Sequence, residues 1–230
     1  MIEYAEVFES IQGEGPMQGH PATFIRLAGC NLKCDFCDTP QAQLSLGLTE
    51  MSSTELAMLM MDRINKRSDV EHPFVFTGGE PLLQQRGIYK ALRYLSMDAV
   101  LGGTANVWFE TNGTVKPHHE ILSMRPRFVV SPKNGHVHLD VLRRFPSART
   151  YLKFVMKDTG VTDWSWKLME VMEIYNGMSL PKDHVYMMPQ AKTREEMLSA
   201  GPKVWQWCLG NGFNYSSRLH VMLFDEMKGV

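Results

Sequence analysis

The sequence lacks a marked excess of charge of either sign, and it lacks a long hydrophobic run. Its 230 residues carry a formal net charge of −1, so the basic footprint of a nucleic-acid-binding protein is missing. No apolar stretch reaches the roughly 20 residues that a membrane-spanning helix needs. The first residues, Met1 to Glu6, show neither the basic nor the apolar region of a secretory signal. We therefore expect a cytoplasmic protein with no nucleic-acid partner and no membrane partner.

Internal repeats, low-complexity tracts and linkers rich in proline, glycine and serine are also lacking. Nothing in the composition therefore marks a boundary between domains. A chain of 230 residues can bury one substantial core. We expect residues 1–230 to form a single domain.

Short apolar runs typical of strands alternate with helical patterns along the chain. The runs that predict strands are 22–27, 74–76, 106–109, 128–130, 151–156, 185–188 and 219–223. The stretches that predict helices are 52–67, 82–95, 163–175 and 193–210, the first and last of which open at capping-box spacing. Such alternation predicts a parallel sheet with right-handed crossovers. About six units fall short of a closed eight-unit barrel, so the expected fold is α/β, a partial, open parallel β/α barrel.

Polar and glycine-rich clusters follow these predicted strands. They are Gly29-Cys30, Thr77-Gly78-Gly79-Glu80-Pro81, Glu110-Thr111-Asn112-Gly113, Ser131-Pro132-Lys133 and Pro189-Gln190. The carboxyl ends of parallel strands share one edge of a sheet, and ligands bind at that edge. We therefore expect these clusters to contribute to one site.

Three of the four cysteines lie within eight residues, as Cys30, Cys34 and Cys37. Clustered cysteines in a cytosolic chain indicate metal or redox chemistry. Three thiolates can each bind a different iron of a [4Fe–4S] cluster, which leaves the fourth iron open to another ligand. The remote Cys208 has apolar neighbours and is expected to be a buried, inert thiol.

Two other interpretations of the cysteine loop remain open. A structural zinc ion could take the three thiolates together with His136 or His138, although a second pair of ligands is not apparent. A redox disulfide between Cys34 and Cys37 would leave Cys30 unexplained.

The loop C-x3-C-x2-C after a predicted strand resembles the signature of the radical S-adenosylmethionine (SAM) superfamily. Other segments accompany this loop along the chain: Glu9 to Gly15, Phe24 to Leu32, Cys34 to Thr39, Thr77 to Pro81, Glu110 to Gly113, Ser131 to Lys133, His220 and the terminal Lys228-Gly229-Val230. In these segments the chain is similar to one family, the 7-carboxy-7-deazaguanine synthases. The resemblance runs in order along the whole chain, and Gln12-Gly13-Glu14-Gly15 with Cys37-Asp38-Thr39 makes it specific.

The resemblance implies a defined reaction in queuosine and 7-deazapurine biosynthesis. SAM would bind the open iron of the cluster on Cys30, Cys34 and Cys37, and one electron would cleave it to a 5′-deoxyadenosyl radical. This radical would take a hydrogen from 6-carboxy-5,6,7,8-tetrahydropterin. The ring then contracts, ammonia leaves and 7-carboxy-7-deazaguanine forms, with SAM regenerated and Mg²⁺ supporting the rearrangement.

The resemblance also assigns residues to SAM and to the metal ion. Those expected to contact SAM are Phe36, Asp38, Gly79, Glu80, Ser131, Pro132, Lys133 and Gln190. Glu80 could instead cap the following helix, and Ser131-Pro132-Lys133 could be a plain surface turn. Thr39 is the expected Mg²⁺ ligand, because Mg²⁺ prefers hard oxygen ligands and often takes few from protein.

The substrate residues implied by the resemblance are Gln12, Gly13, Glu14, Arg26, Thr77, His220 and, if it is the true terminus, Val230. Gln12 to Glu14 would read the amide-like edge of the pterin. Arg26 lies in a predicted strand, where an unpaired charge is costly. It either pairs with an internal acid or meets the substrate carboxylate, and we favour the carboxylate. His220 lies in the last predicted strand, where a structural role is the alternative.

Two competing functions follow from the same residues. A radical SAM activase of a glycyl-radical partner would share the cysteine loop without needing Arg26 or Gln12 to Gly15. A non-enzymatic zinc-binding module would need neither SAM nor iron. The family suggests a homodimer, and the electron donor is unidentified.

Overall fold

The computed structural model describes residues 1–35, 37, 39–40, 49–67, 71–97, 105–133, 135–157 and 168–227. Three predicted site residues, Phe36, Asp38 and Val230, lie outside this range, as does the predicted start of the helix at 163–175. The chain divides into two compact units. The first comprises Met1–Ser10, Pro21–Thr111 and Pro117–Arg127, and the second comprises Ile11–His20, Asn112–Lys116 and Phe128–Val230. A single domain over residues 1–230 stays a prediction.

The first unit contains a sheet with the strand order β3-β1-β2-β4-β5. Its strands are β1 (Ile2–Ile11), β2 (Pro21–Leu27), β3 (Thr49–Met51), β4 (Phe74–Gly78) and β5 (Val107–Thr111). Strands β2, β4 and β5 run parallel, whereas β1 and β3 pair antiparallel. Because the parallel strands are buried, their sequences are nearly continuous apolar runs. The strand predictions for 22–27, 74–76 and 106–109 are confirmed.

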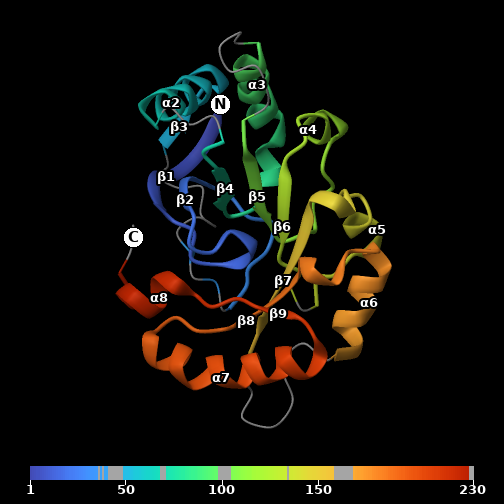
Figure 1. Cartoon of the computed structure of the whole chain (residues 1–230). Helices are drawn as coiled ribbons and strands as arrows, with labels where there is room; N and C mark the ends of the chain where they lie inside the picture. The colour runs from blue at the N-terminus through green and yellow to red at the C-terminus, as the bar shows by residue number, and fades with distance from the viewer. Residues whose placement is uncertain are drawn as a thin grey trace. The chain divides into compact units, whose positions relative to one another are not determined.

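Helices α2 (Ser53–Arg67), α3 (Gln85–Ser96) and α4 (His119–Ser123) follow the strands of this unit. Figure 1 shows α2 and α3 side by side. The predicted capping box opens α2, because Ser52 N donates to Glu55 and Glu55 N donates to the Ser52 hydroxyl. The core of this unit combines aliphatic side chains with aromatic ones, among them the stacked rings of Phe76 and Phe109, which lie 5.3 Å apart.

The second unit has the strand order β6-β7-β8-β9. These strands are β6 (Arg127–Val130), β7 (Thr150–Met156), β8 (Val185–Pro189) and β9 (Asn214–Tyr215), and each pair runs parallel. In neither unit does the strand order close into a ring. The fold is therefore the predicted open parallel sheet with intervening helices.

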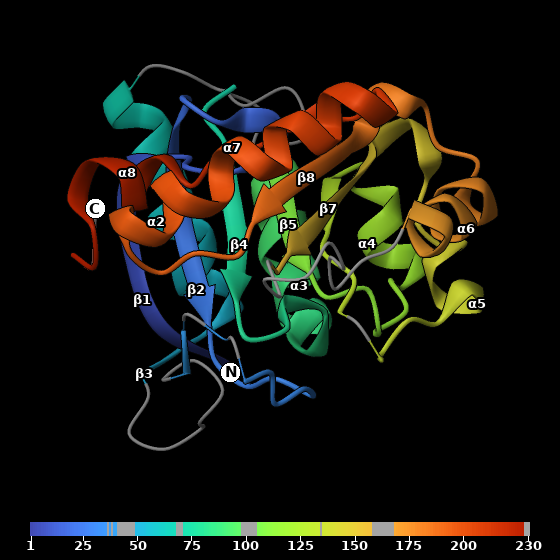
Figure 2. The ribbon, with the colours of Figure 1, turned by 90° about the horizontal axis from the view of Figure 1, so that it is seen from below.

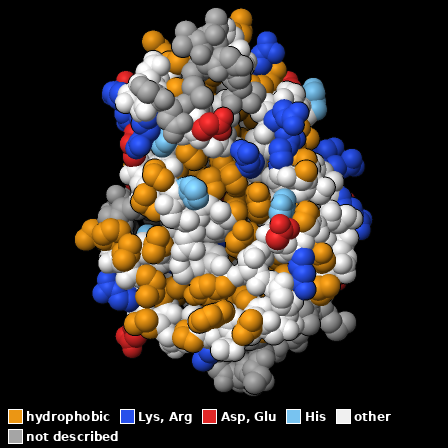
Figure 3. Space-filling model, viewed as in Figure 1, with side chains coloured by type: hydrophobic (Ala, Val, Ile, Leu, Met, Phe, Trp, Pro, Cys, Tyr) orange, Lys and Arg blue, Asp and Glu red, His pale blue; other side chains and the backbone are white. Residues whose placement is uncertain are grey.

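The helices of the second unit are α5 (Leu139–Leu142), α6 (Leu168–Met178), α7 (Arg194–Asn211) and α8 (Leu219–Phe224). Helix α7 packs along β8 (Figure 2) and opens with the predicted capping box of Thr193 and Glu196. Apolar side chains remain exposed over α7 and α8 (Figure 3), including Trp205 at 60% and Leu209 at 70% exposed.

The strand predicted at 219–223 is wrong, because this segment forms helix α8. Its short, nearly continuous apolar run is typical of a buried strand, but here the segment packs on α7, where Met222 and Val221 join an apolar cluster with Met197. Arg194 donates to the carbonyls of Met222 and Leu223, which satisfies backbone groups left open at the helix end. Tertiary packing therefore overrides the local pattern. No helix in the described part of the chain is long and apolar enough to cross a membrane.

Candidate active site

The cysteine loop leaves the carboxyl end of β2 in the first unit. Cys30, Cys34 and Cys37 are half-buried, and none of the three forms a disulfide. Cys37 N donates to Cys34 O at 3.1 Å and Leu32 N lies 3.4 Å from Cys30 Sγ, which gives the loop a turn at each end. Thr39 lies beside this loop, with its hydroxyl 3.9 Å from Cys37 Sγ.

The segment Gly78 to Glu80 at the end of β4 is hydrogen-bonded directly to the entry of the cysteine loop. Gly79 N donates to Leu27 O at 3.1 Å and Glu80 N donates to Gly29 O at 2.8 Å. Gly78 has φ +113°, and a β-carbon there would lie 2.2 Å from Leu27 O. Only glycine allows the two backbones to approach this closely.

Glu80 is fully buried and caps the helical segment that follows it, η2 (Pro81–Gln84). Its Oε1 accepts from Leu82 N at 3.0 Å and from the Thr111 hydroxyl at 2.8 Å. The capping role weighed from the sequence is therefore present. Its expected contact with the SAM ammonium stays a prediction.

Arg26 and Thr77 occupy paired positions on the neighbouring strands β2 and β4. Arg26 Nε lies 2.6 Å from Glu6 Oε1, and its guanidinium lies 5.5 Å from the centre of the Phe8 ring. The Thr77 hydroxyl donates to Glu110 at 2.8 Å. Arg26 thus has an internal acid as its partner, the alternative that we did not favour. The Glu6 side chain is 40% exposed and that of Arg26 19%, so the pair lies near the surface of the unit. Its contact with the substrate carboxylate stays a prediction.

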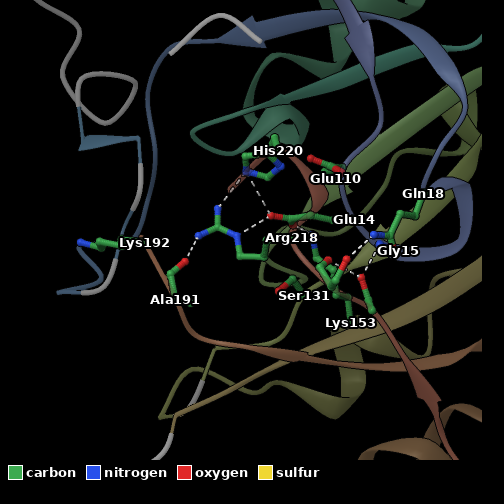
Figure 4. A network of polar contacts seen from close by, with 12 residues as sticks. Glu14, Gly15, Gln18, Glu110, Ser131, Lys153, Ala191, Lys192, Arg218 and His220 are labelled. Carbon is green, nitrogen blue, oxygen red and sulfur yellow. Dashed lines mark hydrogen bonds and ion pairs between the residues drawn. The ribbon is translucent and has the colours of Figure 1, made fainter. Parts of the chain in front are cut away.

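In the second unit Glu14 lies between two cations (Figure 4). Its Oε2 is 2.5 Å from Lys153 Nζ, and its Oε1 is 2.8 Å from Arg218 Nε. His220 Nε2 lies 3.9 Å from the same Oε1. Burial by itself raises the pKa of Glu14, but the charges of Lys153, Arg218 and His220, with the hydrogen bond from Lys153, outweigh it and hold the pKa well below its usual range.

Gln12, Gly13 and His220 gather around Glu14, although they come from opposite ends of the chain. The Gln12 side chain is buried and its carbonyl accepts from Glu14 N at 3.1 Å. Leu219 N donates to Gly13 O at 2.9 Å, which places α8 directly against the loop. The predicted substrate residues Gln12, Gly13, Glu14 and His220 are therefore neighbours.

The expected SAM residues of the second unit follow β6 and β8. Lys133 Nζ donates to the Ser131 hydroxyl at 2.9 Å across the buried Pro132. Gln190 continues the pairing of β7 and β8, since its N donates to Met156 O at 2.8 Å. These residues present a cation, a hydroxyl and an amide near strand ends. Their contacts with SAM stay predictions.

Cys208 is buried in α7, and its thiol donates to Asn214 O at 3.6 Å. Burial raises the pKa of Cys208 to about 12. The prediction that Cys208 is buried is confirmed, and the raised pKa makes its thiol a poor metal ligand at neutral pH.

The sequence analysis missed Lys153 and Arg218. Both side chains are only 8% exposed, and a nearly buried charge needs a partner. For Lys153 the sequence did contain a signal, namely a charged residue inside the apolar run predicted as the strand 151–156. Arg218 lies beside a segment assigned to the wrong element, so no comparable signal pointed to it.

A parallel open sheet that carries three clustered thiols on the loop after a strand is the arrangement of a radical SAM enzyme. Residues 24–188 match the model of the Radical SAM superfamily. The chain is 30% identical over 236 residues to 7-carboxy-7-deazaguanine synthase of Pyrobaculum aerophilum, which covers 99% of this chain and 97% of that protein. It is 34% identical to the enzyme of Thermoplasma acidophilum, over 98% of both chains. The chain therefore belongs to the 7-carboxy-7-deazaguanine synthase family.

Two solved structures share the fold. QueE from Escherichia coli matches with a TM-score of 0.65 at 21% identity, over 95% of this chain and 94% of that one. Native anSMEcpe with bound AdoMet matches with a TM-score of 0.55 at 16% identity, over 87% of this chain and 65% of that one. These matches support the open parallel sheet.

The cysteine loop fits the [4Fe–4S] cluster that membership of the radical SAM superfamily implies. Its donor set is three half-buried thiols within one short loop, none of them in a disulfide, and each can bind a separate iron. Among the described residues, no three His, Cys, Asp or Glu side chains could hold a single metal ion. A [4Fe–4S] cluster does not require three ligands to converge on one metal ion, because each thiolate binds a different iron. Cys30, Cys34 and Cys37 would hold the cluster.

Proposed function

We propose that this protein converts 6-carboxy-5,6,7,8-tetrahydropterin to 7-carboxy-7-deazaguanine. The observation that carries the proposal is similarity along 98–99% of the chain to proteins named for that product. The product differs from the substrate by the atoms of one ammonia molecule. The reaction is therefore a carbon–nitrogen lyase reaction with ring contraction and needs no net oxidant.

Cys30, Cys34 and Cys37 hold the cluster, which together with SAM supplies the carbon-centred radical that starts the reaction. The Gly79 and Glu80 backbone bonds to the loop entry fix the segment that follows β4 beside these ligands. Residues Phe36, Asp38, Gly79, Glu80, Ser131, Pro132, Lys133 and Gln190 are the proposed SAM contacts. Lys133 offers the SAM carboxylate a charge, and Ser131 offers it a hydroxyl.

In this proposal Arg26 binds the substrate carboxylate. Its guanidinium either keeps its ion pair with Glu6 or exchanges Glu6 for the substrate. Glu14 accepts from the amide-like edge of the pterin, and Gln12 and Gly13 shape the loop that carries it. Thr77, His220 and the Val230 carboxylate are the further proposed contacts. Thr39 is the proposed Mg²⁺ ligand, since one hydroxyl and the substrate carboxylate suit a cation that keeps several waters.

The active form is proposed to be a homodimer. Helix α7 exposes apolar side chains (Figure 3). A dimer interface would bury this apolar surface. The electron donor is an unidentified partner.

The deciding experiment is an anaerobic assay of reconstituted protein with SAM, a chemical reductant, Mg²⁺ and the tetrahydropterin. Mass spectrometry should detect 7-carboxy-7-deazaguanine, with SAM regenerated. If SAM is cleaved while the pterin is untouched, the substrate is wrong and the glycyl-radical activase becomes the better hypothesis. The matched control is Cys34→Ala, which should form no product.

A further inference from the structure

The carboxylate of Glu14 is held by two cations that are distant in sequence. Lys153 comes from the middle of β7 and Arg218 from the residue before α8, and both side chains are 8% exposed against 13% for Glu14 (Figure 4). Buried charges are costly to bring together unless they are paired and hydrogen-bonded. This trio is therefore unlike an exposed ion pair, whose geometry is weakly fixed.

Arg218 is fixed by more than Glu14. Its Nη1 donates to the carbonyl of Ala191, and its Nη2 lies 3.5 Å from His220 Nε2. Its Nε donates to Glu14 Oε1 at 2.8 Å. The direction from which the guanidinium meets the carboxylate is thus set by the backbone after β8.

The loop that carries Glu14 is anchored independently of the carboxylate. Gly15 N donates to the Ser216 hydroxyl at 2.8 Å, and the Gln18 side chain donates to the Ser217 hydroxyl. Since these bonds already tie the loop to the segment before α8, the two cations are not needed for that purpose alone. They act on the charge and direction of the carboxylate itself.

An ionised carboxylate accepts hydrogen bonds and donates none, and it has about four acceptor positions. Lys153 and the Nε of Arg218 engage one position on each oxygen. Both oxygens retain capacity for a further donor. Two oxygens with a fixed direction match a ligand edge that carries two adjacent N–H groups.

We propose that Lys153 and Arg218 are positioning residues that hold Glu14 as an oriented acceptor for the 2-amino and N3–H donors of the pterin ring. This inference rests on the proposed function and adds a specificity determinant to it. A ring with a carbonyl in place of the 2-amino group sets an acceptor against the carboxylate and is rejected. Lys153 and Arg218 act on the substrate only through Glu14.

The test compares Lys153→Met with Lys153→Arg and with the control Ser217→Ala. The control removes the acceptor of the Gln18 bond and leaves the carboxylate untouched. For each variant, kcat and KM for the tetrahydropterin are measured across pH, together with the Kd of SAM. Inhibition by 6-carboxypterin is compared with inhibition by its 2-oxo analogue, 6-carboxylumazine.

Lys153→Met should raise KM about tenfold or more, with the Kd of SAM unchanged. The acid limb of kcat/KM should move to higher pH, since removal of a neighbouring cation raises the pKa of Glu14, while Arg218 and His220 remain beside it. Preference for the pterin over the lumazine should fall. Lys153→Arg should restore most of each property. Ser217→Ala should change none of them, because the bond from Gly15 N to the Ser216 hydroxyl still anchors the loop.

A purely structural role for Lys153 predicts equal losses at every pH and an unchanged preference, and that result would overturn the inference. If Lys153→Met does not fold, Arg218→Lys replaces it. That variant keeps a charge, so KM should rise while the acid limb stays in place, and an unchanged KM would contradict the inference. If the wild-type protein forms no 7-carboxy-7-deazaguanine, the proposed function is wrong. If the wild-type protein is active and Lys153→Met leaves KM, the pH profile and the ligand preference unchanged, only this inference is wrong.

Discussion

Gly13 leaves no room for a side chain beside His220. A β-carbon on Gly13 would lie 2.2 Å from Nδ1 of His220, well inside van der Waals contact. Leu219 N also donates to Gly13 O, so the loop from the beginning of the chain and the helix near its end are in direct contact. The close approach explains a glycine next to Glu14 without any appeal to an unusual backbone conformation.

Gly13→Ala should displace the His220 ring. Overpacking of this kind costs about 1–3 kcal/mol of the free energy of unfolding, and kcat/KM for the tetrahydropterin should fall while the Kd of SAM is unchanged. Thermal unfolding and steady-state kinetics measure the two effects. Gly210→Ala in α7 is the matched control, because its β-carbon would enter open space and should leave both unchanged or add slight stability.

Cys34→Ala should abolish cluster binding, and with it SAM cleavage. The measurement is iron content and visible absorption after anaerobic reconstitution. Cys208→Ala is the control, because burial keeps that thiol protonated, and it should retain full iron content. A brown Cys34→Ala protein with an intact cubane would remove Cys34 from the ligand set.

The strands could be predicted from the sequence wherever a strand is buried. The runs at 74–76 and 151–156 are continuously apolar apart from Lys153, and both appear as strands β4 and β7. Strand β1 was missed because polar residues interrupt it and its side chains are mostly half-buried. A local pattern is weak for strands of this kind.

The candidate site could be predicted where its residues lie together in a short sequence motif. The three clustered thiols and the glycines beside Glu80 are recognisable from the sequence alone. The partners of Glu14 are not, because Lys153 and Arg218 lie 139 and 204 residues away in the chain. Only the parallel sheet and the turn before α8 bring them to the same carboxylate.

Arg26→Ala should weaken binding of the tetrahydropterin far more than binding of SAM. The reason is that the substrate carboxylate loses its cation, and calorimetric Kd values for both ligands provide the measurement. Glu6→Gln is the matched variant, since it removes the charge now 2.6 Å from Arg26 Nε and leaves the arginine in place. It should keep or tighten substrate binding. Equal losses for both ligands in Arg26→Ala would instead mean that Arg26 is structural.

Glu14 should make the protein sensitive to acid. Its pKa is held well below the usual range by the neighbouring cations against the opposing effect of burial. The folded state therefore binds fewer protons than the unfolded chain, whose glutamates titrate near about pH 4.3. The stabilisation is fully present above that pH and is lost as pH falls through the lower, folded pKa.

Glu14→Gln tests this relationship directly. At neutral pH it should cost about 3–5 kcal/mol of the free energy of unfolding, because it leaves Lys153 and Arg218 without their counter-charge. The slope of unfolding free energy against pH should flatten below about pH 4.3. Glu9→Gln is the control: the pKa of Glu9 is also lowered, chiefly by the hydrogen bond from Arg67, but both side chains are 37% exposed. Its effect should stay within about 1 kcal/mol, and an equal effect in the two variants would show that burial of the Glu14 trio contributes nothing.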